Sequence, residues 1–307
     1  MQESSDKTVV GITGATATGK TGVSIQIAKH YQCPVVSFDS RQFYQELAIS
    51  SAAPTVKEMN GVPHYFISSH SLKNPINAAQ YSEAANKLVK NLFKENETIV
   101  MVGGSGLYLS AFLSELNTLP DAHQNIRKNL NRIFETKGIQ VLSEMMRCYD
   151  PDYYQIVDRR NPHRLIRGLE VCMQSGLPYS DLIKASEKGP MLFNFIGIHL
   201  TEVKAMLEQR IAQRTNEMLQ RGLIHEVKSI HKLKLNPPLQ SIGYDEITLY
   251  LNGQIPLKEA KTRININTIA YAKRQVTWFR KKGYREFHHS QKKEILDFLA
   301  AGTNTSN

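Results

Sequence analysis

The chain has 307 residues, a length typical of one large domain with an insertion or of two domains. Hydrophobic residues make up 41% and charged residues 21%, which is the composition of a folded protein and excludes a largely disordered chain. No apolar run approaches the roughly eighteen residues of a membrane span. The polar stretch before residue 8 also lacks the apolar core of a signal peptide. We therefore expect a cytoplasmic protein that does not bind a membrane.

The net charge of +10 is a first indication of a partner. Such an excess favours a polyanion, and nucleic acid is favoured over a membrane because no apolar anchor accompanies the basic residues. A generally basic surface without a partner is the alternative. The three cysteines and ten histidines show no ligand spacing, so neither a disulfide framework nor a bound transition metal is expected.

Strands and helices alternate in the first hundred residues. Buried strands are predicted for three apolar, β-branched runs, at 8–13, 35–38 and 98–102. Helices are predicted from apolar spacing at 20–30 and 78–93. This alternation predicts an α/β fold, a parallel sheet flanked by helices, with a ligand crevice at the carboxyl ends of the strands. Three residues fall at such ends: Gly14, Asp39 and Gly103.

The pattern changes at 117–189, where short, charged helical segments broken by prolines replace the strands. We expect this stretch to be a helical insertion, and residues 1–116 and 190–307 to form one core with C-terminal helices. In the second part of that core, a strand is predicted at 193–200. Helices are predicted at 202–221, 223–234 and 257–282.

Residues 14–21, GATATGKT, match the P-loop pattern G-x-x-x-x-G-K-T between a predicted strand and a predicted helix. The backbone N–H groups of such a loop bind phosphate oxygens, assisted by the helix N-terminus. Lys20 supplies a positive charge, and the Thr21 hydroxyl can reach a bound Mg²⁺. The core is therefore predicted to be P-loop NTPase-like. The predicted phosphate-binding residues of this loop are Gly14, Ala15, Thr16, Ala17, Thr18, Gly19, Lys20 and Thr21.

A P-loop alone does not define its ligand, because kinases, ATPases and diphosphate-using transferases share it. Only the run 35–39 combines an apolar strand with a terminal acid, Asp39. That carboxylate would either hold Mg²⁺ through water or face an acceptor as a base.

The chain resembles the tRNA dimethylallyltransferase (isopentenyltransferase) family, in its bacterial form without a C-terminal zinc finger. The resemblance rests on segments in family order: GATATGKT at 14–21, DSRQFY at 39–44, VGGSGLYL at 102–109, NPHRLIRGLEV at 161–171, RIAQRTNEMLQRGLIHEV at 210–227, IGYDEI at 242–247 and YAKRQVTWFRK at 271–281. It implies transfer of a dimethylallyl group from dimethylallyl diphosphate to N6 of the adenine 3′ of the anticodon, position 37 of tRNA. The resemblance also implies release of diphosphate and Mg²⁺ as the cofactor.

The resemblance, together with the chemistry, gives three predicted catalytic residues: Asp39, Ser105 and Arg214. Asp39 would accept the proton of the adenine amine, with a water-mediated Mg²⁺ ligand as the alternative. Ser105 stands where the family usually carries threonine and would contact both substrates, unless it is a plain turn serine. Arg214, and Arg210 one helical turn before it, would bind the diphosphate. The alternative is a solvated charged helix face.

Two basic segments are predicted to contact the anticodon stem-loop of tRNA. Asn161 and Pro162 predict the start of a helix, with arginines along one face where they can follow phosphates. The segment 257–282 carries aromatic residues along one side, which either stack on unpaired bases or belong to the core. The predicted tRNA-binding residues are Ser40, Arg41, Gln42, His163, Arg164, Arg167, Arg274, Gln275 and Trp278.

Some positions depart from the family pattern. The stretch 49–54, ISSAAP, replaces Ile-Gly-Thr-Ala-Lys-Pro, and Asp245 and Ile269 replace basic residues. Three other functions stay open: an adenylate isopentenyltransferase acting on free nucleotide, a P-loop kinase, and a non-catalytic RNA-binding paralogue. The basic, aromatic stretch 271–281 favours the tRNA enzyme over the adenylate enzyme. We expect a monomer whose partners are tRNA and dimethylallyl diphosphate.

Overall fold

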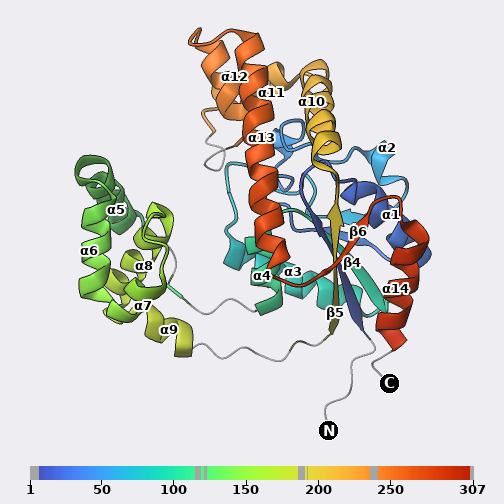
Figure 1. Cartoon of the computed structure of the whole chain (residues 1–307), viewed down its shortest axis with the longest axis horizontal. Helices are drawn as coiled ribbons and strands as arrows, with labels where there is room; N and C mark the ends of the chain where they lie inside the picture. The colour runs from blue at the N-terminus through green and yellow to red at the C-terminus, as the bar shows by residue number, and fades with distance from the viewer. Residues whose placement is uncertain are drawn as a thin grey trace. The chain divides into compact units, whose positions relative to one another are not determined.

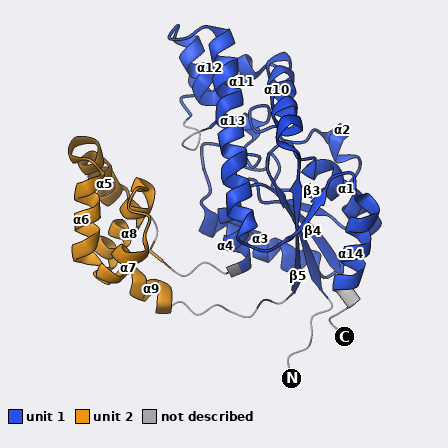
Figure 2. Ribbon diagram, in the orientation of Figure 1, with its two compact units in different colours: residues 1–113, 191–307 blue, residues 114–190 orange. Residues whose placement is uncertain are grey.

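The computed structural model describes residues 7–114, 119–120, 123–185, 191, 193–235 and 241–304. It divides the chain into two compact units, residues 1–113 with 191–307 (unit 1) and residues 114–190 (unit 2) (Figure 2). The boundaries expected at 116/117 and 189/190 lie outside the described residues. Each unit has its own hydrophobic core.

Unit 1 is built on a parallel sheet of six strands in the order β3-β2-β4-β1-β5-β6 (Figure 1). The strands are β1 (Thr8–Gly14), β2 (Val35–Ser37), β3 (His64–Tyr65), β4 (Thr98–Val102), β5 (Asn194–Thr201) and β6 (Arg285–His288). The predicted α/β fold and its four predicted strands are confirmed. The sequence pattern does not predict β3, which has two residues, or β6, in which only Phe287 is buried.

Helices cover both faces of the sheet (Figure 1). On one face, apolar side chains of β2 and β4 pack against α3 (Ala78–Leu92), α4 (Gly106–Ser114) and the end of α13 (Leu257–Arg280). On the other face, β1 and β5 pack against α1 (Lys20–His30) and α14 (Lys292–Asn304). Two short helices, η1 (Gln45–Leu47) and α2 (Val56–Met59), lie in the connection between β2 and β3. The sheet is therefore the middle of three layers.

A second core of unit 1 forms around the beginning of α13. It contains Leu223, Val227, Ile247 and Ile264, supplied by α11 (Leu223–Lys232), α12 (Tyr244–Leu251) and α13. Side chains from the end of α10 (Lys204–Gln220) pack against it. With 24 residues, α13 is about 36 Å long, so it spans from this core to the sheet (Figure 1).

Unit 2 consists of the helices α5 (Gln124–Lys137), α6 (Ile139–Tyr149), α7 (Pro151–Ile156), α8 (Pro162–Ser175) and α9 (Tyr179–Ala185). Leu130, Leu142, Met146 and Leu165 are among its buried core residues. The predicted start of α8 is confirmed, because the Asn161 side chain accepts a hydrogen bond from the Arg164 N–H and Pro162 is the first helical residue. Among the described residues of both units, no helix combines the length and apolar composition needed to cross a bilayer.

Candidate active site at the carboxyl edge of the sheet

The loops at the carboxyl ends of the strands carry the polar residues of unit 1. β1 leads into the P-loop, β2 leads to Asp39, and β4 leads to the glycine-rich turn that begins at Gly103. Since all strands are parallel, these segments meet at one edge of the sheet, as the sequence predicts.

The P-loop is held in shape by its own side chains. The Thr18 hydroxyl donates to the Ala15 carbonyl at 2.8 Å. Gly14 leaves no room for a Cβ against the Leu200 carbonyl, and Gly19 caps α1 with a φ of 85°, a conformation that favours glycine. The first N–H groups of α1 are thereby presented to the cavity beside the loop, the arrangement that binds phosphates.

The Lys20 ammonium lies within this loop, where it donates to the carbonyls of Gly14 at 3.0 Å and Ala15 at 2.7 Å. Burial lowers the pKa of Lys20 to about 8, the Asp39 carboxylate partly opposes this shift, and the Arg214 guanidinium adds to it. A bound anion would reverse this shift, because it stabilises the charged form.

Two adjoining cavities lie beside the P-loop, and Asp39 lines both. The larger, of about 330 Å³, has mainly polar walls formed by Thr16, Ala17, Gly19, Lys20, Thr21, Asp39, Gln42, Ser51, Arg210, Gln213, Arg214 and Glu217. The smaller, of about 50 Å³, shares Thr16, Asp39, Ser51 and Arg214 with it. The apolar side chains in the wall of the smaller cavity are Ile211, Met218, Ile242 and Ile264.

Both predicted arginines of α10 face the P-loop. Arg214 donates to the Thr16 hydroxyl at 2.7 Å and to the Ala52 carbonyl at 3.3 Å. Arg210 lies 3.5 Å from the Ala17 carbonyl. A solvated charged face is therefore the wrong description for this side of α10.

Asp39 and Ser105 are brought together by the loops after β2 and β4. One Asp39 oxygen accepts from the Arg41 N–H at 3.2 Å. Ser105 is 9% exposed, and its hydroxyl accepts from the Ser40 N–H at 3.1 Å and lies 3.1 Å from the Ser40 hydroxyl. Ser105 therefore joins two site loops, which a plain turn serine would not do.

The end of α13 packs directly on the glycine-rich turn. A Cβ on Gly104 would collide with the Gln275 amide, and a Cβ on Gly106 would collide with the Trp278 ring. These close approaches explain why the turn carries glycine at both positions.

Comparison with known proteins decides the family. A model of the IPP transferase family matches residues 42–282. The chain is 37% identical over 300 residues to the tRNA dimethylallyltransferase of Christiangramia forsetii, covering 97% of this chain and 99% of that protein. It is 35% identical to tRNA dimethylallyltransferase 1 of Bacteroides fragilis, covering 96% and 98%. The chain belongs to the IPP transferase family.

A solved structure of the family has the same fold. The full-length tRNA isopentenylpyrophosphate transferase of Bacillus halodurans is 31% identical, with a TM-score of 0.72 over 98% of both chains. The resemblance stated from the sequence motifs is thus confirmed over nearly the whole chain.

Two residues expected to contact tRNA have other roles in this IPP transferase. Gln275 is 5% exposed; its amide nitrogen donates to the Gly104 carbonyl and its oxygen accepts from the Thr16 N–H, both at 2.9 Å. It links the P-loop to the turn after β4. Arg167 donates to the buried Glu170 carboxylate at 3.0 Å and to the Pro120 carbonyl at 2.8 Å. Together with Arg127, which lies 2.6 Å from the same carboxylate oxygen, it neutralises an internal acid of unit 2. The burial of Gln275 corrects its expected tRNA contact, and the internal pairing of Arg167 argues against such a contact.

The remaining predicted tRNA contacts are accessible. His163 and Arg164 are exposed on α8, and Arg274 and Trp278 are exposed on α13. Near Asp39, Ser40 and Gln42 are half-buried and the Arg41 guanidinium lies over the Tyr271 ring at 4.6 Å.

One site residue lies in the segment 210–227 of the family resemblance, but the sequence does not predict its role. The Glu226 carboxylate of α11 accepts from the N–H groups of Ile49 at 2.7 Å and Ser50 at 2.9 Å. It thereby anchors the segment that departs from the family pattern and supplies Ser50 and Ser51 to the smaller cavity. Glu226 is 176 residues from Ser50, so only the fold reveals the contact.

Proposed function

We propose that this chain transfers the dimethylallyl group of dimethylallyl diphosphate to N6 of the adenine 3′ of the anticodon in tRNA, and releases diphosphate. The observation that carries the proposal is the position of Asp39. It lies in the wall that the P-loop cavity shares with a smaller cavity containing apolar side chains. A diphosphate suits the first cavity, a prenyl group suits the second, and a carboxylate stands where the two halves of the substrate meet.

The diphosphate would bind to the P-loop amides, Lys20, Arg210 and Arg214. Negative charge grows on this group as the bond from carbon to oxygen breaks, so fixed donors around it stabilise the transition state more than the ground state. The hydrogen bond from Arg214 to Thr16 already places that guanidinium beside the P-loop before a ligand arrives.

The prenyl group would lie against the four apolar side chains of the smaller cavity. Ile211 and Met218 lie on α10, Ile264 lies on α13 and Ile242 lies just before α12. Three of them, Met218, Ile242 and Ile264, also pack in the second core. The apolar side chains of this wall favour a bound hydrocarbon chain over the γ-phosphate of a nucleoside triphosphate. This feature favours a prenyltransferase over a P-loop kinase.

The acceptor would approach with its amine toward Asp39. The adenine amine is a weak nucleophile because its lone pair is delocalised into the ring. As the bond from N6 to the prenyl carbon forms, its electrons come from the amine and those of the breaking carbon–oxygen bond leave with the diphosphate. The N6 proton passes to the Asp39 carboxylate. Ser105, fixed beside Ser40, would orient the amine or the diphosphate.

Mg²⁺ is the proposed cofactor. The Thr21 hydroxyl and the Asp39 carboxylate both line the larger cavity, and oxygen atoms are the ligands that Mg²⁺ prefers. Thr21 would hold the ion directly, and the bound ion would add positive charge beside the leaving diphosphate. The variant Asp39→Asn distinguishes the two roles open to Asp39, that of a base and that of a ligand of the ion through water.

The affinity for dimethylallyl diphosphate should decrease above pH 8. Lys20 is charged below its pKa of about 8, and the anion prefers the charged form, so binding weakens as the pH rises through that value. The expected decrease is up to about tenfold per pH unit. Calorimetry between pH 7 and 9.5, without tRNA, measures it. Lys20→Arg stays charged and serves as the control; an equal pH dependence in both proteins would contradict the prediction.

Binding of tRNA should depend on salt through exposed arginines and not through paired ones. Arg164→Ala should reduce the slope of log affinity against log salt by about one unit, because one phosphate contact is lost. Arg167→Ala should leave the slope unchanged and lower the free energy of unfolding by about 2 kcal/mol, because it breaks a charged hydrogen bond to Glu170. Filter binding at several salt concentrations and melting curves on both variants test this. A slope change in Arg167→Ala would restore its predicted tRNA contact.

A transfer assay separates the tRNA enzyme from an adenylate isopentenyltransferase and from a non-catalytic paralogue. Purified protein is given labelled dimethylallyl diphosphate with either unmodified tRNA or AMP. We expect transfer to tRNA and little to AMP. Efficient, salt-independent transfer to AMP would identify an adenylate isopentenyltransferase. Salt-dependent tRNA binding without transfer would identify a non-catalytic paralogue. The only feature that favours this alternative is the departure from the family pattern at residues 50–53.

A further inference from the structure

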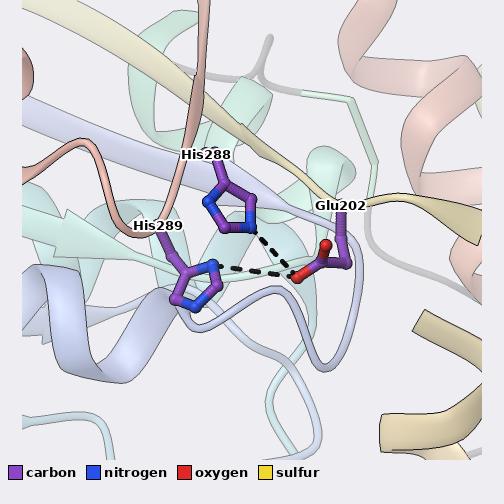
Figure 3. Close-up of side chains that lie close together, drawn as sticks. All are labelled: Glu202, His288 and His289. Carbon is purple, nitrogen blue, oxygen red and sulfur yellow. Dashed lines mark hydrogen bonds and ion pairs between the residues drawn. The ribbon is translucent and has the colours of Figure 1, made fainter. Parts of the chain in front are cut away.

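The last strands of the sheet bring an acid and two histidines to the edge that carries the P-loop. Thr201 of β5 pairs with His288 of β6, so the residues that follow these positions, Glu202 and His289, lie side by side (Figure 3). The Glu202 side chain is only 4% exposed. The cluster has no signal in the sequence, because 86 residues separate Glu202 from His288.

One oxygen of Glu202 is the centre of this cluster. Its Oε2 accepts from Nη1 of Arg210 at 2.9 Å. Nε2 of His288 lies 3.4 Å from the same atom, and Nδ1 of His289 lies 3.7 Å from it (Figure 3). The other oxygen accepts from the Val203 N–H at 3.0 Å. The carboxylate is therefore surrounded by donors, with Arg210 the nearest charged one.

Arg210 connects this cluster to the P-loop. Its Nη2 lies 3.2 Å from Nε2 of His289, and its Nη1 lies 3.5 Å from the Ala17 carbonyl. The His289 side chain also packs on the loop, with its Cβ 3.0 Å and its ring 3.1 Å from where a Cβ on Gly19 would lie. The guanidinium is thus fixed on one side by Glu202 and His289 while it lines the phosphate cavity with the other.

The hydrogen-bond directions disfavour a metal as the partner of this arrangement, although the buried Nδ1 of His289 has no hydrogen-bond partner among the described residues. The spacing alone would permit one, because the three ligand atoms lie within 4.8 Å of one another. A guanidinium can only donate, so Nε2 of His289 must be the acceptor and the proton of the neutral ring is on Nδ1, toward Glu202. If a metal were bound to Nδ1, the ring proton would be on Nε2, and that N–H would point at the N–H of Arg210 with no acceptor between them. Burial, with the charges of His288 and Arg210, lowers the pKa of His289, which favours this neutral ring.

We propose that Glu202 is a positioning residue that, with His289, holds Arg210 in the orientation that binds the diphosphate. The inference rests on the proposed function and adds a residue to it. An exposed arginine loses considerable rotamer freedom when it binds a ligand, and a side chain held beforehand loses less. A carboxylate near an anion site is otherwise unfavourable, and the loss of its charge alone would strengthen anion binding. Removal of the Glu202 charge would therefore weaken anion binding through the loss of positioning and strengthen it through the loss of repulsion. The sign of the measured change in affinity shows which effect is larger.

The test is a double-mutant cycle of Glu202→Gln and Arg210→Ala in the full chain, with calorimetric affinity for inorganic pyrophosphate and kcat/KM for dimethylallyl diphosphate as readouts. Each single variant should weaken pyrophosphate binding about tenfold, and the double variant should be no weaker than Arg210→Ala. The KM for tRNA should stay unchanged. Glu208→Gln is the matched control, because it removes an exposed acid from the same helix, where Glu208 contacts only Lys204 at 3.9 Å among the ion pairs of the described residues.

Multiplicative losses in the double variant, or wild-type or tighter binding in Glu202→Gln, would overturn the proposal. So would tight, one-to-one zinc binding that Glu202→Gln abolishes, since the cluster would then be a metal site. If Glu202→Gln melts below the assay temperature, His289→Ala replaces it in the cycle, and the same non-additivity is expected. Pyrophosphate binding does not require prenyl transfer, so an inactive wild-type enzyme would contradict the proposed function and leave this cycle interpretable.

Discussion

Asp39→Asn should lower the rate of dimethylallyl transfer by roughly 10²–10⁴ while leaving the affinity for dimethylallyl diphosphate near that of the wild type. The asparagine oxygen can still accept from the Arg41 N–H, so the loop should keep its shape. The amide cannot take the proton that N6 must lose. Single-turnover assays with tRNA at pH 7 and saturating dimethylallyl diphosphate measure the effect, because the pKa of Lys20 decreases further when the nearby carboxylate is lost.

Asp297→Asn, which changes an exposed acid on α14, is the control for this variant. Transfer at a near-normal rate in Asp39→Asn would remove Asp39 from the mechanism. A rate that recovers when Mg²⁺ is raised would instead assign Asp39 to the ion, as a ligand through water.

Arg214→Ala should lower the single-turnover rate at saturating dimethylallyl diphosphate by about 10²–10³, the range for loss of one donor to a developing anion. The half-buried guanidinium contacts the Thr16 hydroxyl and lies in the walls of both cavities, so it can stabilise the charge that moves to the leaving group. Rapid-quench measurement of the first turnover isolates the chemical step from product release.

Arg221→Ala provides the matched control, because it removes an exposed arginine at the end of the same helix. Melting curves show whether each variant is folded at the assay temperature. If Arg214→Ala raises only the KM, the guanidinium binds the ground state and the transition state equally, and its proposed catalytic role is wrong.

The sequence predicts the central part of the site because its residues lie beside regular elements. Residues 8–14 form an apolar strand, residues 20–30 form a helix, and the P-loop motif lies between them, so both its position and its shape follow. Asp39 and Gly103 follow strands of the same parallel sheet, which places them at the same edge. The predicted helices of the core are confirmed with ends within two residues.

The corrections concern long-range pairing, which one sequence does not display. Arg167 fits a basic surface stripe by helical spacing, but it pairs with Glu170, which lies one turn later, is fully buried and also contacts Arg127. Gln275 lies among exposed basic residues in the sequence, yet it meets Gly104 and Thr16, which are 171 and 259 residues away. Periodicity describes which face a side chain occupies and says nothing about which segment covers that face.

Two of the elements that the pattern misses, α4 and β6, are short or uniform in character. The helix α4 is apolar on all sides and follows directly after a glycine-rich turn, so it lacks the period that predicts a helix. The strand β6 has two exposed charged residues beside its single buried one. Because the sequence does not predict β6, it also does not predict the cluster of Glu202 and His289, which the pairing of β5 with β6 creates.

The most direct measurement of the central claim is the identity of the modified base. Purified protein is incubated with Mg²⁺, dimethylallyl diphosphate and a tRNA transcript that has adenine 3′ of its anticodon, and the tRNA is fragmented and analysed by mass spectrometry. The account predicts one dimethylallyl group, on N6 of that adenine, with one diphosphate released for each group transferred. A tRNA that stays unmodified, or one that is prenylated at another base, would contradict it.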